Sequence, residues 1–363
     1  MSFWEAQGSS AYLAGARLFV VLASLTSSPR LRWIADRAAA EPLLGEVTLE
    51  RVASSLVRPR GRGACATVVL FNGVTERGRQ HPGVRRLAIA LARAGFLVLV
   101  PDLHGLARGE ISEATVADAV DVCCAAVEWP EARAGRIGLL GLSVGTTVAL
   151  LAAEDERLSE RISAVTGIAP YTDFANIIRL ATTGSYRDGA DRVDYPVPSF
   201  LQLVVARSLA VAVPGSVDRA FLTAALADVD AAALDPLAEL RQLPRAGLSP
   251  AAQAVLELTL NRDPDRFDAL YAALPAEMRA AGARLSPLAH AERLRAPVEL
   301  LSAPRDKYFP LAESQALARA APTVRVTVAR ALAHAEPRIT LREPGGLGEL
   351  SRFGIRALRS LGQ

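Results

Sequence analysis

The sequence predicts an α/β fold: a mostly parallel central sheet flanked by helices, with a helical cap inserted before the penultimate strand. Two observations predict it. From residue 66 onward, short β-branched or aliphatic runs alternate with helical patterns, which is typical of βαβ units. In addition, about 115 residues separate the strand ending near Tyr171 from the next one, near Val298, far more than a crossover needs. We expect these residues to form a separate cap.

Composition sets limits on partners and compartment. Of 363 residues, 51% are hydrophobic and 22% charged, so the chain can bury a large core, and intrinsic disorder is excluded. Lys and Arg number 41 against 38 acidic residues, and this small excess predicts no nucleic-acid partner. The three cysteines show no CxxC spacing, so neither a disulfide framework nor a zinc site is indicated. A reducing, cytoplasmic compartment is expected.

The N-terminal segment, residues 1–46, is expected to be helical. Its residues 11–25 are strongly apolar but are interrupted by Arg17, and they are fewer than the roughly 20 that a membrane span needs. The basic region of a signal peptide is also missing before them. We expect this stretch to pack on the domain, and contact of residues 11–25 with a membrane surface is the alternative.

The strands and helices of the core follow in order. Residues 47–56 are expected to supply antiparallel edge strands before the parallel ones begin. Between the first two parallel strands, apolar residues recur at helical spacing until Gly95, and a second helix over 112–129 is stopped by Pro130. The parallel strands are predicted at 67–71, 96–100, 136–140, 164–168, 298–301 and 324–328.

The cap divides the core into two parts. Proline-containing breaks separate helical patterns within it. The predicted cap helices cover 200–213, 219–226, 250–260 and 267–281. We therefore expect core residues at 47–172 and 287–363, with the cap at 173–286.

The segment Gly141-Leu142-Ser143-Val144-Gly145 lies between a predicted strand and a predicted helix. G-x-S-x-G in this context is the pattern of a nucleophile elbow. The tight turn strains the backbone of the serine and exposes its Oγ, while the glycines lack the Cβ atoms that would clash. The helix N-terminus also favours a developing oxyanion. Ser143 is therefore the predicted nucleophile.

A serine hydroxyl needs a base to remove its proton, and the base needs a carboxylate to hold it. His334 lies just after the last predicted strand, and Asp306 directly follows the strand before it. The chain order Ser, Asp, His is the order found in hydrolases of this architecture. Asp173 is the competing acid, because it follows a neighbouring strand.

The oxyanion needs two backbone N–H donors. Val144, directly after the nucleophile, is expected to supply one, and Val74, in the loop after the first parallel strand, the other. Gly73 would let this loop approach closely. The candidate substrate-binding residues are Asn72, Gly73, His104 and Tyr171.

Together these motifs resemble the α/β-hydrolase superfamily, in particular its serine esterases and lipases with a helical cap, over residues 47 to the C-terminus. The resemblance implies Ser143 as nucleophile, His334 as base and Asp306 as acid, with Val144 and Val74 as oxyanion donors.

The predicted function is hydrolysis of carboxylic esters through an acyl-enzyme, on a small-molecule ester that is apolar on one side. No cofactor or metal is expected, because the sequence holds no P-loop, G-x-G-x-x-G or H-E-x-x-H motif.

Two alternatives to the esterase function are left open by the sequence. One is a thioesterase or acyltransferase with the same Ser, Asp and His residues, and the other is a non-catalytic binding protein on this fold. The oligomeric state is not predicted. Cap side chains that could form an apolar pocket are Phe200, Leu201, Leu203, Val204, Phe221, Leu222 and Leu226.

Overall fold

The structure is a computed structural model that describes residues 3–25, 30, 33, 37, 39–61, 63–330, 332–334, 336–337 and 344–363. Parts of the predicted N-terminal segment therefore lie outside the described residues. The strands are β1 (Leu43–Leu49), β2 (Val52–Arg58), β3 (Cys65–Phe71), β4 (Phe96–Pro101), β5 (Ala132–Leu142), β6 (Ile162–Ile168), β7 (Ser185–Asp188), β8 (Asp191–Asp194), β9 (Val298–Ser302), β10 (Val324–Val328), β11 (Leu332–Ala333) and β12 (Glu336–Pro337). The α-helices are α1 (Phe3–Leu25), α3 (Pro82–Arg93), α4 (Glu113–Val127), α5 (Val144–Ala153), α6 (Phe174–Thr183), α7 (Ser199–Val211), α8 (Ser216–Ala227), α9 (Ala238–Gln242), α10 (Pro250–Leu260), α11 (Phe267–Ala273), α12 (Ala276–Arg284), α13 (Leu311–Ala320) and α14 (Pro344–Leu361). Short 3-10 helices are η1 (Gly78–Gln80), η2 (Leu106–Arg108), η3 (Glu156–Leu158) and η4 (Pro287–Arg293).

Eight of the described strands form the central sheet, in the order β1-β2-β4-β3-β5-β6-β9-β10. The pairs β1/β2 and β2/β4 are antiparallel, and all later neighbours are parallel. The predicted α/β fold class is confirmed. The expected boundary after residue 46 is wrong, because β1 begins at Leu43. Most of β1 is exposed, so its sequence lacks the apolar alternation that would have marked its start.

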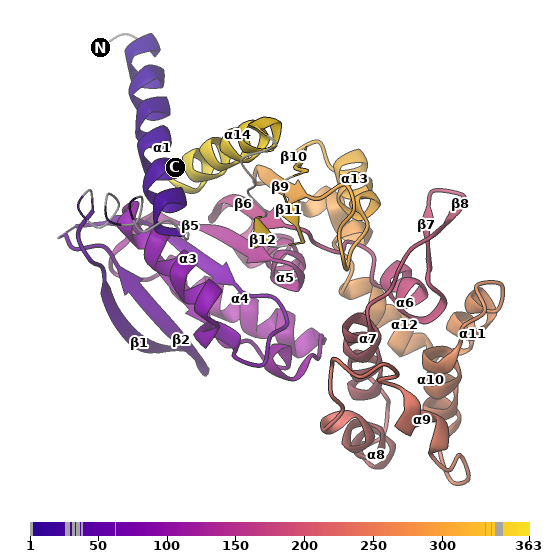
Figure 1. The fold of residues 1–363 in the computed structure, drawn as a ribbon. Helices are drawn as coiled ribbons and strands as arrows, with labels where there is room; N and C mark the ends of the chain where they lie inside the picture. The colour runs from indigo at the N-terminus through magenta and orange to yellow at the C-terminus, as the bar shows by residue number, and fades with distance from the viewer. Residues whose placement is uncertain are drawn as a thin grey trace.

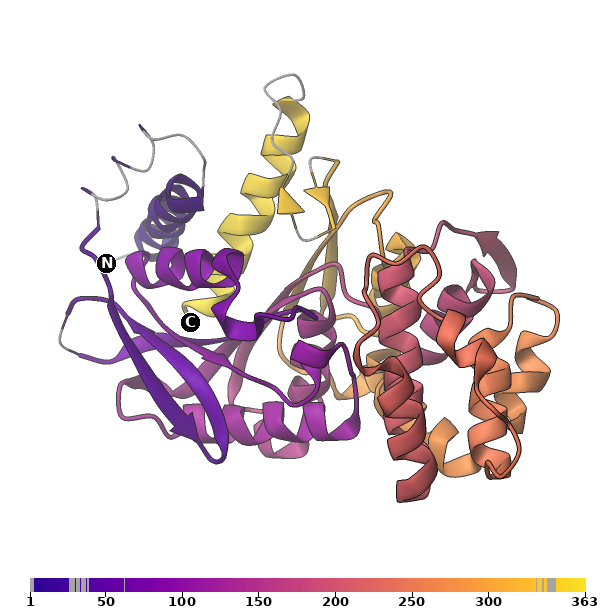
Figure 2. The ribbon, with the colours of Figure 1, turned by 60° about the horizontal axis from the view of Figure 1, so that its bottom comes forward.

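Helices cover both faces of this sheet, because successive side chains of a strand point to opposite faces. In β3, Val68 and Leu70 belong to the apolar cluster that includes α3 and the end of α14, whereas Val69 and Phe71 belong to the cluster with α4 and α5. These four side chains are fully buried. Figures 1 and 2 show the sheet between the two helical layers.

The insertion from α6 to α12 lies at one end of the sheet (Figures 1 and 2). It is not wholly helical, because β7 and β8 form an antiparallel hairpin around Gly189, whose φ is +63°. This hairpin was not predicted, because its sequence is polar and lacks an apolar run. The single helix expected at 267–281 is also wrong: α11 and α12 are separate, and Pro275 caps the second.

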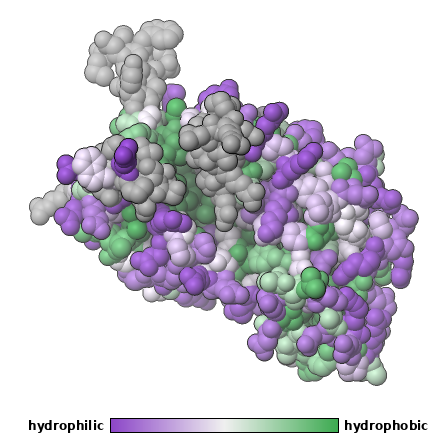
Figure 3. Space-filling view, viewed as in Figure 1, coloured by the Kyte–Doolittle hydropathy of each residue, from purple (hydrophilic) through white to green (hydrophobic). Residues whose placement is uncertain are grey.

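Helix α1 lies against α3 and α14. Leu18 and Val21 are buried on that side, while Leu13 and Phe19 are 55% and 48% exposed. Figure 3 shows an apolar area near the base of α1 and a mixed polar and apolar surface over the insertion. Among the described residues, no helix is long and apolar enough to cross a membrane.

Candidate active site

Ser143 occupies the tight turn between β5 and α5 with φ +54° and ψ −127°. Residues other than glycine rarely adopt this backbone conformation, so the surrounding structure has to hold the turn in place. A Cβ on Gly141 would lie 2.3 Å from Thr146 Cα, and a Cβ on Gly145 would lie 2.3 Å from the Phe71 carbonyl oxygen. Both positions therefore accept glycine alone, which is the physical reason for the G-x-S-x-G spacing.

The elbow is anchored on the neighbouring strand β6. The N–H of Ser143 donates to the carbonyl of Ile168 at 2.8 Å. The Thr146 hydroxyl, one turn into α5, accepts from Ile168 N–H at 3.0 Å and donates to its carbonyl at 3.1 Å. A Cβ on Gly167 would lie 1.9 Å from Thr146 Cγ2, so β6 requires glycine here. Sequence reasoning missed Thr146 and Gly167, because they become neighbours only through strand pairing.

The candidate acid and base are in contact. His334 Nδ1 lies 2.8 Å from Asp306 Oδ1, although 28 residues separate them in the chain. Asp306 is 4% exposed, and the same oxygen accepts the N–H groups of Tyr308 at 2.8 Å and Phe309 at 3.0 Å. Its Oδ2 is buried and has no partner in the described part of the chain. These bonds fix the position of the carboxylate.

Asp173, the competing acid, serves a different purpose. Its Oδ1 accepts from the N–H groups of Ala175 at 2.9 Å and Asn176 at 3.3 Å, as the N-cap of α6. Its own N–H donates to the buried carboxylate of Glu313 at 2.9 Å. The described contacts of Asp173 therefore explain it as a helix cap.

Parallel topology brings the three candidate catalytic residues to one edge of the sheet. Ser143 directly follows β5, Asp306 lies in the loop after β9, and His334 follows the short strand β11 in the segment after β10. The carboxyl ends of β5, β9 and β10 all meet at that edge. Within the described residues, no hydrogen bond joins Ser143 to His334. Catalytic hydrogen bonds are often long before substrate binds, and they tighten in the complex.

The loop after β3 approaches the candidate nucleophile. A Cβ on Gly73 would lie 3.1 Å from Ser143 Cβ and 3.0 Å from the Leu142 carbonyl oxygen. Asn72, 2% exposed, shapes this loop by donating from Nδ2 to the Gly73 carbonyl at 2.8 Å. In the described part of the chain, neither Val74 nor Val144 has a hydrogen-bond acceptor for its N–H.

Aromatic rings surround the candidate base. The ring centroid of Tyr308 lies 4.6 Å from that of His334 in an edge-on arrangement, and Phe309 lies at 5.9 Å. The ring centroid of Phe200, from α7 of the insertion, lies 5.5 Å from that of Tyr308, also edge-on. Sequence reasoning missed the roles of Tyr308 and Phe309, although their position directly after the candidate acid was a usable signal.

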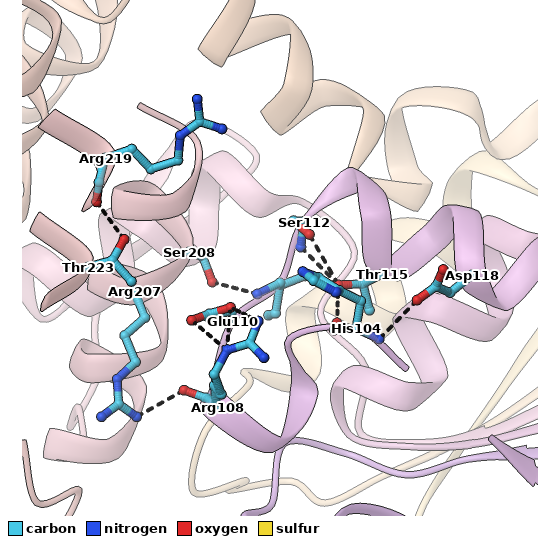
Figure 4. A network of polar contacts seen from close by, with 11 residues as sticks. His104, Arg108, Glu110, Ser112, Thr115, Asp118, Arg207, Ser208, Arg219 and Thr223 are labelled. Atoms are coloured by element: carbon cyan, nitrogen blue, oxygen red, sulfur yellow. Dashed lines mark hydrogen bonds and ion pairs between the residues drawn. The ribbon is translucent and has the colours of Figure 1, made fainter. Parts of the chain in front are cut away.

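Two of the residues predicted to bind substrate lie apart from the contacts of the candidate triad. Tyr171 is fully buried, with its ring against Phe174 and Phe309, so it faces no open site. The side chain of His104 is exposed, and the structure gives it no contact with the candidate triad. Its backbone N–H donates to Asp118 and its carbonyl accepts from Thr115, so this residue braces the loop after β4 (Figure 4).

The insertion also touches the core through α7. Arg207 donates to the Arg108 carbonyl at 3.0 Å, and Ser208 Oγ accepts from Ile111 N–H at 3.0 Å (Figure 4). Most of the apolar cap residues named as pocket candidates pack inside the insertion and are at most 3% exposed. These buried residues are Leu201, Leu203, Val204, Leu222 and Leu226. Phe200 and Phe221 are less buried.

Comparisons with known proteins place the chain in a family. Among solved structures, it is similar to a putative dienelactone hydrolase from Klebsiella pneumoniae (15% identity, TM-score 0.46, covering 86% of this chain and 96% of that one). It is also similar to an esterase from Pyrococcus furiosus (15%, 0.46, 92% and 95%) and to dipeptidyl peptidase 4 from Porphyromonas gingivalis (12%, 0.49, 91% and 38%). No curated protein matches it. The family profile described as alpha/beta hydrolase fold matches residues 66–334, most of the chain. The chain therefore belongs to the alpha/beta hydrolase fold family.

Proposed function

We propose that this protein is a serine hydrolase that cleaves carboxylic esters through an acyl-enzyme. The hydrogen bond between His334 Nδ1 and Asp306 Oδ1 is the observation that carries the proposal. An imidazole held by a buried carboxylate is the group that turns a serine hydroxyl into a nucleophile. Ser143, partly exposed at the strained elbow on the same sheet edge, is the hydroxyl available to it.

In the first half of the reaction, His334 Nε2 takes the proton of Ser143 as Oγ attacks the ester carbonyl. The N–H groups of Val74 and Val144 hold the negative oxygen of the tetrahedral intermediate. Collapse of the intermediate breaks the ester C–O bond, and the imidazolium gives its proton to the leaving alcohol. The acyl group is then bound to Ser143.

In the second half, His334 takes a proton from water as the water oxygen attacks the acyl carbon. The second tetrahedral intermediate collapses, the acid product leaves, and the proton returns to Ser143. Asp306 stays ionised throughout; it fixes the tautomer of the imidazole and stabilises the imidazolium formed in each half. Neither step requires a cofactor.

The nucleophile assignment is tested with a fluorophosphonate probe, which labels activated serines covalently. We expect wild-type protein to be labelled and Ser143→Ala to lose labelling completely, because that change removes the only atom that attacks. His334→Ala should be nearly as damaging, since triad members act as a unit. Ser216→Ala, an exposed serine at the start of α8, is the matched control and should be labelled like wild type.

Labelling of Ser143→Ala at the wild-type rate would show that another residue reacts, and the proposal would be wrong. The reaction class is tested separately, with p-nitrophenyl esters of increasing acyl length, an acyl thioester and a p-nitroanilide. We expect the esters to be cleaved fastest. A faster thioester, or transfer of the acyl group to an added alcohol, would instead favour the thioesterase or acyltransferase that shares these residues.

A further inference from the structure

The loop that carries the candidate acid is held from outside by the insertion. The hydroxyl of Tyr195, in the segment between β8 and α7, donates to the backbone carbonyl of Asp306. The loop's own bonds are local, because Asp306 Oδ1 accepts from the N–H groups of Tyr308 and Phe309. Those bonds define the shape of the turn, whereas the bond from Tyr195 fixes its place relative to the insertion.

Tyr195 is itself firmly placed. Its N–H donates to the carbonyl of Gly184 at 2.8 Å. Its ring meets that of Tyr186 edge-on, with centroids 5.7 Å apart and planes at 84°. Burial, with a smaller contribution from the charge of Asp306, raises the pKa of Tyr195, so the hydroxyl keeps its proton and donates at neutral pH.

A second contact links the insertion to the candidate base. Phe200, just beyond Tyr195 in the chain, packs edge-on against Tyr308, and Tyr308 packs edge-on against His334. One short segment of the insertion, residues 195–200, therefore contacts the acid loop at its backbone carbonyl and at the aromatic ring that borders the imidazole.

We infer that Tyr195 is a positioning residue through which the insertion holds Asp306 in register with His334. The inference rests on the proposed function. The 2.8 Å hydrogen bond between Asp306 and His334 has to survive each proton transfer, and a small displacement of the loop would lengthen it. When the insertion is seated on the core, Tyr195 prevents that displacement.

Tyr195→Phe tests the inference, because it removes the hydroxyl and keeps the ring on Tyr186. The control is Tyr186→Phe, which removes a hydroxyl from the same aromatic pair; in the described residues, that hydroxyl makes no hydrogen bond. The rate of fluorophosphonate labelling is measured from pH 5 to 9 for wild type, both variants and Ser143→Ala. Lys307, over the ring of Tyr308, is unchanged in all of them, so its charge does not account for a difference.

We expect Tyr195→Phe to be labelled about tenfold more slowly than wild type at the plateau, since misplaced catalytic groups lose rate steeply. The pH dependence of its labelling rate should also differ from that of wild type, because a displaced carboxylate no longer holds the imidazole in the same way. Tyr186→Phe should stay within about twofold of wild type, with no shift. A purely structural role for the hydroxyl would lower the melting temperature and leave the pH profile in place.

A second readout needs no probe. The proton on His334 Nδ1, hydrogen-bonded to a carboxylate, is expected to give a far-downfield NMR signal that is lost in Asp306→Asn, and Tyr195→Phe should shift or broaden it. A Tyr195→Phe profile that overlays the Tyr186→Phe profile would overturn the inference, as would a Tyr195→Phe variant that fails to fold. If wild type is not labelled at all, the proposed function itself fails, and that outcome is distinct from either of these.

Discussion

A single carboxylate oxygen, Asp306 Oδ1, accepts three hydrogen bonds: from two backbone N–H groups and from the imidazole of His334. The two backbone bonds cannot be lost without unfolding the turn, so they hold the oxygen where His334 needs it. His334 has φ +55°, and Ser143 has φ +54°. Such conformations cost on the order of 1–3 kcal/mol each and tend to occur at functional sites.

This geometry predicts unequal effects for two aspartates. Asp306→Asn should slow fluorophosphonate labelling by about a thousandfold or more, because a neutral amide no longer stabilises the imidazolium. Asp173→Asn should slow it by less than about tenfold, since asparagine also caps helices. Labelling rates of the two purified variants, with their melting temperatures, check this. If Asp173→Asn were the more damaging change, the acid would be Asp173 and the fold assignment would be unaffected.

Two kinds of signal predicted the candidate site. Ser143 has a local motif, and its two glycines are required because a Cβ on either one would lie 2.3 Å from a backbone atom. Asp306 and His334 have no such motif; they were predicted from their positions after the last two parallel strands and from the chain order Ser, Asp, His. Tyr195 lacks both signals. It is a tyrosine in a proline-containing loop, and only the packing of the insertion brings it to Asp306.

At the scale of elements, the central strands were predictable because they are buried on both faces and read as unbroken apolar runs. The exposed strand β1 and the polar hairpin β7–β8 give no such run.

Helix α5 has a functional group at one end and a buried carboxyl group at the other. It carries Ser143 at its N-terminus and ends on Glu154, which is 6% exposed and whose Oε1 has no partner in the described residues.

The pKa of Glu154 predicts a pH-dependent stability. Burial, reinforced by Glu292 and opposed by Arg293, raises this pKa to about 9 from an ordinary value of 4.5. Between these values the folded protein holds a proton that the unfolded chain releases, so the free energy of unfolding falls as pH rises through this window. Glu154→Gln removes the ionisation. Wild type loses about 1.4 kcal/mol per pH unit over this window, so the variant should unfold with a free energy about 5 kcal/mol higher than wild type at pH 8.5.

Urea unfolding of the two proteins at several pH values measures this difference. It should shrink as the pH is lowered and vanish at about pH 3, well below the ordinary pKa of 4.5, where the wild-type carboxyl is protonated in both states. Glu156→Gln changes an exposed carboxylate two residues further along the chain and is the control; it should leave stability within about 0.5 kcal/mol at every pH. A constant gain for Glu154→Gln at all pH values would contradict the proposed proton linkage.

Across the whole molecule, the first and last helices, α1 and α14, lie against each other on one face of the sheet, away from the insertion (Figures 1 and 2). Leu18 of α1 lies so close to Gly354 of α14 that a Cβ on the glycine would be 2.4 Å from Leu18 Cδ1. The buried side of α1 is thus part of the core, joined to α3 and the final helix. The apolar character of residues 11–25 is shared between this buried side and an exposed one.

That division predicts opposite outcomes for neighbouring residues. Leu18 is 8% exposed. Leu18→Ala should lower the free energy of unfolding by about 2–4 kcal/mol, because removing a packed side chain leaves a cavity. Phe19, 48% exposed, should change it by less than about 0.5 kcal/mol on the same substitution. Urea unfolding of both variants decides whether α1 is docked on the domain, and equal small effects would show that it is not. Flotation with anionic phospholipid vesicles tests the alternative, and wild type should stay with the unbound protein. Flotation that Phe19→Ala abolishes would mean that the exposed side of α1 contacts membrane while its buried side packs on α3 and α14.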